Sequence, residues 1–147
     1  MERSDSDKKR VLFLCTGNSC RSQMAEALTN HFLGDRLSAF SAGTAPAGYV
    51  HHLVVRALAE IGIHHQGESK SIERFNGQAF DVVITLCDDA AENCPLWLGQ
   101  GERVHIGFHD PALATGRDSD RLDVYRQVCD DIRRRVLSYL REYEAAK

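Results

Sequence analysis

The 147-residue sequence contains no apolar run near the roughly 18 residues that a membrane-spanning helix needs. It also lacks an export leader, because its first ten residues, MERSDSDKKR, are charged and carry neither an apolar segment nor a cleavage pattern. These absences exclude the membrane and secreted classes of protein, and we expect a protein of the cytoplasm. Residues 1–9 are expected to form a short disordered lead-in.

An excess of positive charge is also missing, since 18 Lys and Arg residues stand against 21 Asp and Glu residues, for a net charge of −3. The run RRR at 133–135 follows Asp130 and Asp131, which is typical of a solvated helix face. Proteins that bind nucleic acid neutralise phosphates with Lys and Arg. We therefore expect neither a nucleic-acid partner nor a membrane partner.

The sequence has no disulfide framework and no metal-binding spacing. Its five cysteines cannot all pair within the chain, and the six residues between Cys87 and Cys94 exceed the C-x2-4-C spacing of structural zinc sites. The histidine pairs 51–52 and 64–65 consist of neighbours, whose side chains point apart on a helix. We therefore expect no metal site, and thiols in a reducing compartment.

What the sequence does have is a regular alternation of strand and helix patterns. Short apolar runs predict four strands, and apolar residues repeating every three or four positions predict three helices. The expected strands cover residues 10–14, 38–44, 80–86 and 102–108, and the expected helices cover residues 22–32, 50–61 and 122–143. The chain shows no repeats and no linker, so we expect a single domain over residues 10–147, acting as a monomer.

This alternation predicts an α/β fold, an open parallel four-stranded sheet with helices on both faces in three layers. Ligands of such sheets bind beyond the carboxyl ends of the strands. Cys15, Cys87 and the HDP at 109–111 follow predicted strands, so we expect them at one edge of the sheet. Cys129 lies on the apolar stripe of the last helix and is expected in the core.

The stretch CTGNSCRS, from Cys15 to Ser22, has the features of an anion-binding loop. It joins a buried strand to the start of a helix, where backbone N–H groups and the helix dipole attract an oxyanion. Gly and Asn permit the curled backbone that such a loop needs, and Arg21 offers two donors to phosphate or arsenate. The expected binding residues are Thr16, Gly17, Asn18, Ser19, Cys20, Arg21 and Ser22.

Cys15 is the expected nucleophile of this loop. The same positive field stabilises a thiolate, and Ser22 can donate a further hydrogen bond to the sulfur. The simpler alternative is that Cys15 is a small buried residue and Arg21 an ordinary helix-start residue, because C-x5-R occurs by chance in many proteins. The position of the motif between a strand and a helix favours the nucleophile.

Four motifs, CTGNSCRSQMAEAL, FSAGT, TLCDDAAENCP and HIGFHDPA, resemble those of the thioredoxin-coupled arsenate reductases, which share the fold of the low-molecular-weight protein tyrosine phosphatases. The resemblance runs through nearly the whole chain and implies a flavodoxin-like topology. It also implies an enzyme that reduces arsenate to arsenite for arsenic detoxification, with thioredoxin as external reductant and no bound cofactor. The loop motif is shared by both families, so it does not separate a reductase from a phosphatase.

Cys87 and Cys94 make that distinction. The resemblance implies a relay in which Cys15 attacks arsenate, Cys87 attacks Cys15, and Cys94 attacks Cys87. A short helix is expected between Cys87 and Cys94, and seven residues of helix rise about 10.5 Å. The Cα atoms of a disulfide lie only about 4.4 to 6.8 Å apart, so forming this bond requires the segment to unwind. The open alternatives are a core thiol at 87 and an incidental loop thiol at 94; Cys20 has no obligatory part.

Asp110 matches the aspartate that serves as general acid in both related families, although Asp-Pro also begins many ordinary turns. Ala112 stands where the phosphatases carry an aromatic residue that holds an aromatic substrate, which favours a small inorganic substrate.

Some arsenate reductases of this kind have a potassium site, and Asn18, Glu26 and Ser41 match three of its contributors. Lys70 stands near the position of an expected aspartate. We expect its ammonium to replace the monovalent cation.

Two other functions remain open. A phosphatase needs only Cys15, Arg21 and Asp110, with the Cys87 and Cys94 thiols as spectators. A non-catalytic oxyanion sensor needs only the loop, and retention of a complete nucleophile and acid argues against it.

Overall fold

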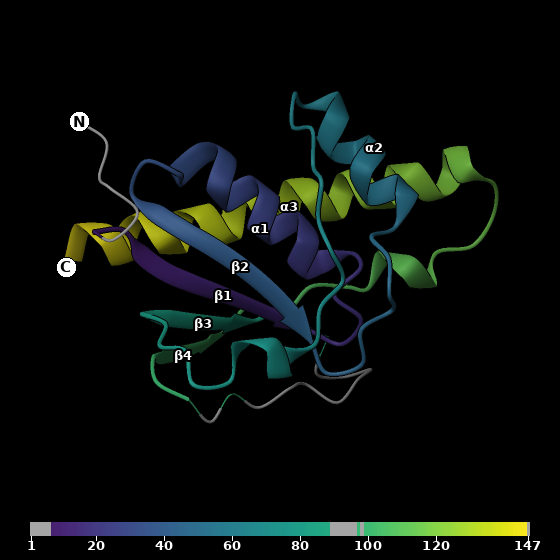
Figure 1. The fold of residues 1–147 in the computed structure, drawn as a ribbon. Coiled ribbons are helices and arrows are strands. Elements are labelled where there is room, and N and C mark those ends of the chain that lie inside the picture. Colours follow the sequence, from purple (N-terminus) through teal and green to yellow (C-terminus); the bar gives the residue numbers. More distant parts are fainter. Residues whose placement is uncertain (1–6, 89–96, 98, 147) are drawn as a thin grey trace.

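The computed structural model describes residues 7–88, 97 and 99–146 (Figure 1). The strands are β1 (Lys9–Cys15), β2 (Leu37–Gly43), β3 (Val82–Thr85) and β4 (Glu102–His105), and the α-helices are α1 (Arg21–Leu33), α2 (His52–Glu60) and α3 (Asp118–Ala146). Two short 3-10 helices, η1 (Ile72–Phe75) and η2 (Pro111–Leu113), were not expected. The expected succession of strands and helices is confirmed, although β1 already begins at Lys9 and β4 ends at His105.

The four strands form one parallel sheet in the order β2-β1-β3-β4. Leu12 of β1 pairs with Phe40 of β2 on one side and with Val83 of β3 on the other. The chain therefore moves from β1 outward to β2 and then crosses back to β3. In sheets of this kind the cleft for a ligand lies where the strand order reverses, beyond the carboxyl end of β1.

The two faces of the sheet are covered differently. Side chains alternate along a strand, so Val11 and Phe13 pack with residues of all three α-helices, whereas Leu12 and Leu14 pack on the opposite face. Figure 1 shows α1, α2 and α3 along the same side of the sheet. Among the described residues, the second face is covered by η1, which supplies Phe75, and by two further segments, which supply Phe80 and Trp97. The expected α/β class and three-layer parallel sheet are confirmed, with the thinner layer built around a 3-10 helix.

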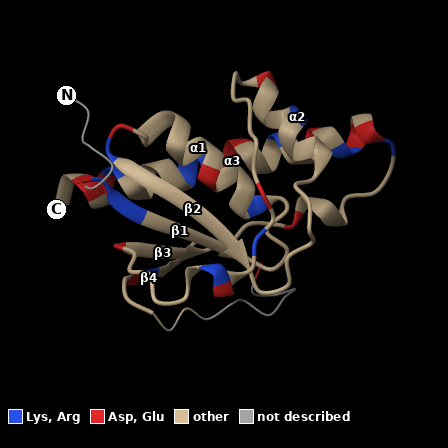
Figure 2. Ribbon diagram, viewed as in Figure 1, with Lys and Arg blue, Asp and Glu red and all other residues tan. Residues whose placement is uncertain are grey.

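α3 lies across α1 and α2 and carries charges of both signs, as Figure 2 shows. Arg134 and Arg135 pair with Asp131 at 3.0 and 3.3 Å, and the Arg133 guanidinium lies over the Phe32 ring. The run at 133–135 is thus a helix surface with its own counter-charges. Over the part of the chain that is described, no helix combines the length and the apolar character needed to cross a membrane.

Candidate active site

The loop that follows β1 joins Cys15 to Arg21, the first residue of α1. Its carbonyl oxygens bond outward to the segment after β2, because Ala45 N–H donates to Thr16 and Ala47 N–H donates to Gly17. Asn18 has a positive φ of 47°, the only such value among the described residues other than glycine. These bonds and this dihedral angle give the loop the tight curvature that the sequence predicts.

Gly43, at the end of β2, allows the sheet to approach this loop closely. It pairs with Cys15 across the sheet, and a Cβ atom at position 43 would lie 2.3 Å from the Thr16 carbonyl oxygen. Any side chain there would displace the loop backbone. The glycine in FSAGT is therefore required by contact with the loop that follows β1.

The Cys15 sulfur lies 2.8 Å from the Ser22 hydroxyl oxygen, and both groups are buried. The Asn18 amide nitrogen, which can only donate, lies 2.8 Å from the same hydroxyl. Ser22 therefore accepts from Asn18, and its own hydrogen remains for the sulfur. The hydroxyl is therefore oriented to donate to the Cys15 sulfur, as the sequence predicts.

Arg21 and Asp110 come together from segments that are far apart in the sequence. The Arg21 guanidinium is almost fully buried, donates to the Phe108 carbonyl oxygen at 3.1 Å and lies 3.8 Å from an Asp110 carboxylate oxygen. The other Asp110 oxygen accepts from Ala112 N–H at 3.0 Å, which fixes the carboxylate at the start of η2. The carboxylate is partly exposed and is thus accessible from the pocket.

A pocket of about 300 Å³ unites these groups. The predicted residues that line it are Cys15, Thr16, Gly17, Ser19, Cys20, Arg21, Asp110 and Ala112. Asn18 and Ser22 are fully buried behind the loop and act through the hydrogen bonds just described. The structure therefore brings the whole predicted loop and Asp110 to one place.

The opposite wall of this pocket was not anticipated from the sequence. Ala47, Tyr49 and His51 complete the lining, and the His51 ring stacks on Tyr125 of α3 with centroids 4.9 Å apart. Tyr125 in turn lies beside Cys20, with its hydroxyl oxygen 3.6 Å from the sulfur. Burial raises the pKa of the Cys20 thiol to about 11 and also raises the pKa of Tyr125. Cys20 is therefore a neutral thiol.

The expectation that neighbouring histidines point apart is wrong for His51 and His52, whose rings stack with centroids 4.7 Å apart. His51 precedes α2 and caps it, because its Nδ1 atom accepts from Leu53 N–H, so the helical geometry assumed for the pair does not apply. Within residues 7–88, 97 and 99–146, no three His, Cys, Asp or Glu side chains are grouped to hold a metal ion.

Cys87 lies at the same sheet edge as Cys15. Leu86 N–H donates to the Leu14 carbonyl oxygen at 2.9 Å, which places the residue after it beside the end of β1. The Cys87 side chain is completely buried, and Cys15, Cys20 and Cys129 are free thiols. Cys94 and the short helix expected before it lie outside the described residues.

The Lys70 ammonium occupies the position at which a monovalent cation was considered. It lies 3.8 Å from a Glu26 carboxylate oxygen, 3.5 Å from the Ser41 hydroxyl and 2.8 Å from the Glu68 carbonyl oxygen. Burial lowers the pKa of Lys70 and raises the pKa of Glu26. With a positive charge already among these oxygens, the arrangement does not fit an additional potassium ion.

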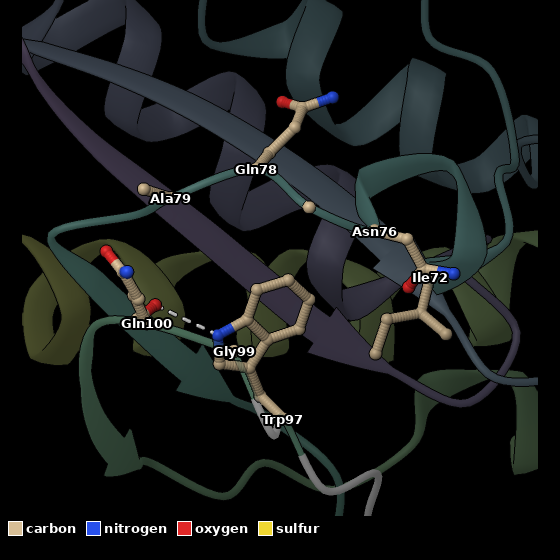
Figure 3. Close-up of a pocket in the computed structure, with 8 residues that line it drawn as sticks. Ile72, Asn76, Gln78, Ala79, Trp97, Gly99 and Gln100 are labelled. Atoms are coloured by element: carbon tan, nitrogen blue, oxygen red, sulfur yellow. Dashed lines mark hydrogen bonds between the residues drawn. The ribbon is translucent and has the colours of Figure 1, made fainter.

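A second hollow, of about 400 Å³, lies on the other face of the sheet beside Trp97 (Figure 3). Its described lining also includes Ile72, Asn76, Gln78 and Gln100, and the Trp97 indole N–H donates to the Gln100 carbonyl oxygen at 3.0 Å. Among the described residues that line it there is no Cys, His, Lys, Arg, Asp or Glu. This hollow is therefore not a candidate for the reaction chemistry.

Comparison with known proteins agrees with this geometry. Residues 10–147 match the model of the low molecular weight phosphotyrosine protein phosphatase family. The chain is 45% identical to an arsenate reductase of Halalkalibacterium halodurans over 134 residues, which cover 90% of this chain and 96% of that protein.

Two solved structures are similar over most of this chain. One, described as an arsenate reductase in the phosphate binding state, has a TM-score of 0.76 and 32% identity, covering 91% of this chain and 98% of its own. A thioredoxin-dependent arsenate reductase of Corynebacterium glutamicum has a TM-score of 0.72 and 26% identity, covering 98% of this chain and 66% of its own. Fold, motif and sequence thus agree, and the chain belongs to the low molecular weight phosphotyrosine protein phosphatase family.

Proposed function

We propose that this protein reduces arsenate to arsenite through Cys15, Cys87 and Cys94, with thioredoxin as the external reductant. The observation that carries the proposal is the pocket in which Cys15, Arg21 and Asp110 meet, in a chain 45% identical to a protein named arsenate reductase. The small Ala112 on the pocket wall suits an inorganic oxyanion. The reaction serves arsenic detoxification in the cytoplasm, where thiols stay reduced.

In the first step, arsenate binds to the loop N–H groups of residues 16–21 and to the Arg21 guanidinium. The Cys15 thiolate attacks arsenic and forms a sulfur–arsenic bond. Asp110 gives a proton to the departing oxygen, which leaves as water. The buried position of Arg21 and its 3.8 Å distance from Asp110 support this division of roles, because both groups reach the same oxyanion.

In the second step, the Cys87 thiolate attacks the Cys15 sulfur. The electron pair of the sulfur–arsenic bond passes to arsenic, so arsenic(V) becomes arsenic(III) and arsenite leaves. The two sulfurs have together lost two electrons and are joined as a disulfide. The position of Cys87 at the sheet edge beside Cys15 supports this step.

In the third step, Cys94 attacks Cys87 and releases Cys15 for the next arsenate. The Cys87–Cys94 disulfide that remains is reduced by the dithiol of thioredoxin. A solved structure 26% identical to this chain is named a thioredoxin-dependent reductase, which favours thioredoxin over a glutaredoxin-like donor.

A phosphatase is the second candidate, because the family model is named for phosphotyrosine phosphatases and Cys15, Arg21 and Asp110 suffice for phosphate ester hydrolysis. In that case the Cys87 and Cys94 thiols take no part in turnover.

One assay pair separates these functions. Arsenate-dependent NADPH consumption is followed with thioredoxin and thioredoxin reductase, or with a glutaredoxin system, and hydrolysis of an aryl phosphate is followed in parallel. A reductase consumes NADPH with arsenate and loses this activity in Cys87→Ser and Cys94→Ser. Aryl phosphate hydrolysis without arsenate-dependent NADPH consumption would identify a phosphatase, and neither activity would indicate a binding protein.

A further inference from the structure

Gln23, in the first turn of α1, is an uncharged side chain with no exposed surface that lies behind the anion-binding loop. Its amide nitrogen donates to the backbone and side-chain oxygens of Asn18, both at 3.1 Å, and to the Glu68 carbonyl oxygen at 3.0 Å. Because three oxygens surround this nitrogen, the orientation of the amide is determined. The Gln23 oxygen must therefore point the other way.

On that other side the Gln23 oxygen lies 2.7 Å from the Nε2 atom of His65. An amide oxygen can only accept, so Nε2 of His65 carries the hydrogen and donates. This assigns the tautomer of a histidine that lies 42 positions along the chain from Gln23, on the loop between α2 and η1.

The hydrogen bonds continue with the same donor-to-acceptor direction from Gln23 to the Cys15 sulfur. The Asn18 side-chain oxygen accepts from Gln23 and from Lys70 N–H, and its nitrogen donates to Ser22, whose hydroxyl is left to donate to Cys15. Four hydrogen bonds thus point in one direction, from His65 through Gln23, Asn18 and Ser22 to the sulfur. Aligned hydrogen bonds polarise one another, so each strengthens the next.

Gly67 shows that the chain leaves room for the first of these bonds. A Cβ atom at position 67 would lie 2.3 Å from both the Gln23 oxygen and the His65 Nε2 atom. The backbone therefore passes directly over the His65–Gln23 hydrogen bond, and any side chain there would push the two groups from their positions.

We propose that His65 is a positioning residue for the Cys15 thiolate, acting through Gln23, Asn18 and Ser22. The proposal rests on the nucleophilic role proposed above for Cys15. His65 does not touch the oxyanion, and its contribution is to orient donors toward the sulfur.

The surroundings of this chain of hydrogen bonds disfavour the charged form of His65. Burial and, to a smaller extent, the Lys70 ammonium lower the pKa of His65. Lys70 itself faces Glu26 of α1, and at the sulfur end Arg21 faces Asp110. A neutral Nε2–H is a dipole and not an added charge, so we expect a moderate effect on the thiolate.

The test measures the thiolate directly, in the fully reduced full-length protein. The rate at which iodoacetamide alkylates Cys15 is followed against pH, with fragment-ion mass spectrometry of the tryptic peptide 11–21 to separate Cys15 from Cys20. His65→Leu, which lacks a donor, is expected to move the profile about half a pH unit upward, so alkylation below the midpoint slows about threefold. His65→Gln, which restores an N–H donor, is expected to follow the wild type.

His64→Leu is the matched control, because His64 is the exposed neighbour and its profile is expected to remain that of the wild type. Gly67→Ala keeps both side chains and is expected to move the profile in the same direction as His65→Leu. Thermal unfolding verifies that each variant is folded.

The proposal is overturned if His65→Leu or Gly67→Ala coincides with the wild type, or if His65→Gln behaves as His65→Leu does. These outcomes are distinct from failure of the proposed function, since no arsenate is used. A wild-type Cys15 that alkylates with the profile of a simple peptide thiol would contradict its role as nucleophile, whatever the variants do.

Discussion

The anion-binding loop carries two cysteines, Cys15 and Cys20, that are similarly buried but have different groups beside their sulfur atoms. Cys15 is 2% exposed and Cys20 is 6% exposed, and both are free thiols. The Cys15 sulfur has a hydroxyl at 2.8 Å that is oriented to donate, whereas the Cys20 sulfur faces the Tyr125 hydroxyl at 3.6 Å, and burial raises its pKa to about 11. Burial raises the pKa of Cys20 although its hydrogen bonds with Tyr125 and Ser19 oppose the shift, and we expect Cys15, beside the oriented hydroxyl, to be the nucleophile.

Replacing the two cysteines in turn is the strongest test of this comparison. Cys15→Ser is expected to lower arsenate reduction at least about 1000-fold, because a serine hydroxyl is neither ionised nor able to form the disulfide. Cys20→Ser is expected to stay within about threefold of the wild type, since its thiol is neutral. Steady-state NADPH consumption with thioredoxin measures both. Comparable losses in the two variants would contradict the distinction.

Asp110 gives the next largest effect. Asp110→Asn is expected to lower kcat about 100-fold, because the amide cannot supply the proton to the departing oxygen. Asparagine keeps the oxygen that accepts from Ala112 N–H, so η2 and the fold are preserved. Asp118→Asn, an exposed aspartate at the start of α3, is the matched control and is expected to keep wild-type kcat.

Much of this arrangement could be predicted from the sequence because it depends on local patterns. The apolar run at 11–14, the C-x5-R spacing and the Asp-Pro at 110–111 place the nucleophile, the guanidinium and the acid beyond the ends of strands in any parallel sheet. The wall at the Cys20 end could not be predicted in this way, since it joins Tyr49 and His51, which follow β2, to Tyr125 of α3. Long-range packing of that kind leaves no periodic signal.

The hydrogen bond between His65 and Gln23 could not be predicted for the same reason. The glycine at position 67 is the sequence feature that accompanies it, but its meaning becomes clear only in the structure. Gly67 does not have a positive φ, and the reason for a glycine there is the close approach of Gln23 and His65. The ammonium of Lys70 was predictable from its place in ESKS, and the structure adds the distances to Glu26 and Ser41.

The next prediction concerns the Lys70 ammonium, which lies beside Glu26 in the place considered for a monovalent cation. Lys70→Met leaves Glu26 buried beside Ser41 without its counter-charge, and we expect a loss of about 1 to 2 kcal/mol in the free energy of unfolding. In this variant potassium chloride is expected to restore stability more than an equal concentration of tetramethylammonium chloride, whereas the wild type responds equally to both. Urea unfolding in the two salts measures this. An equal response of the variant to both salts would refute the idea that the ammonium stands in for a cation.

His51 gives the smallest expected effect, at the Cys20 end. Burial, His52 and Arg121 lower the pKa of His51 below its ordinary value of about 6.5, so the unfolded chain binds this proton more readily than the folded protein does. The stabilisation is present above about pH 6.5 and is lost as the pH falls through the folded pKa. His51→Asn, which can still cap α2, is expected to flatten this dependence between pH 7.5 and 5.5, and the exposed His52→Asn to retain it. An unchanged slope in His51→Asn would remove His51 as its cause.

The central claim is that three sulfur atoms pass an electron pair outward from the pocket, and disulfide mapping after one turnover tests it most directly. Reduced protein is mixed with equimolar arsenate without thioredoxin, alkylated and digested for mass spectrometry. The account predicts one arsenite per chain, a disulfide between Cys87 and Cys94 and a free Cys15. In Cys94→Ser it predicts the same single arsenite with a disulfide between Cys15 and Cys87. Arsenite formed without either disulfide, or a Cys94→Ser variant that turns over repeatedly with thioredoxin, would contradict it.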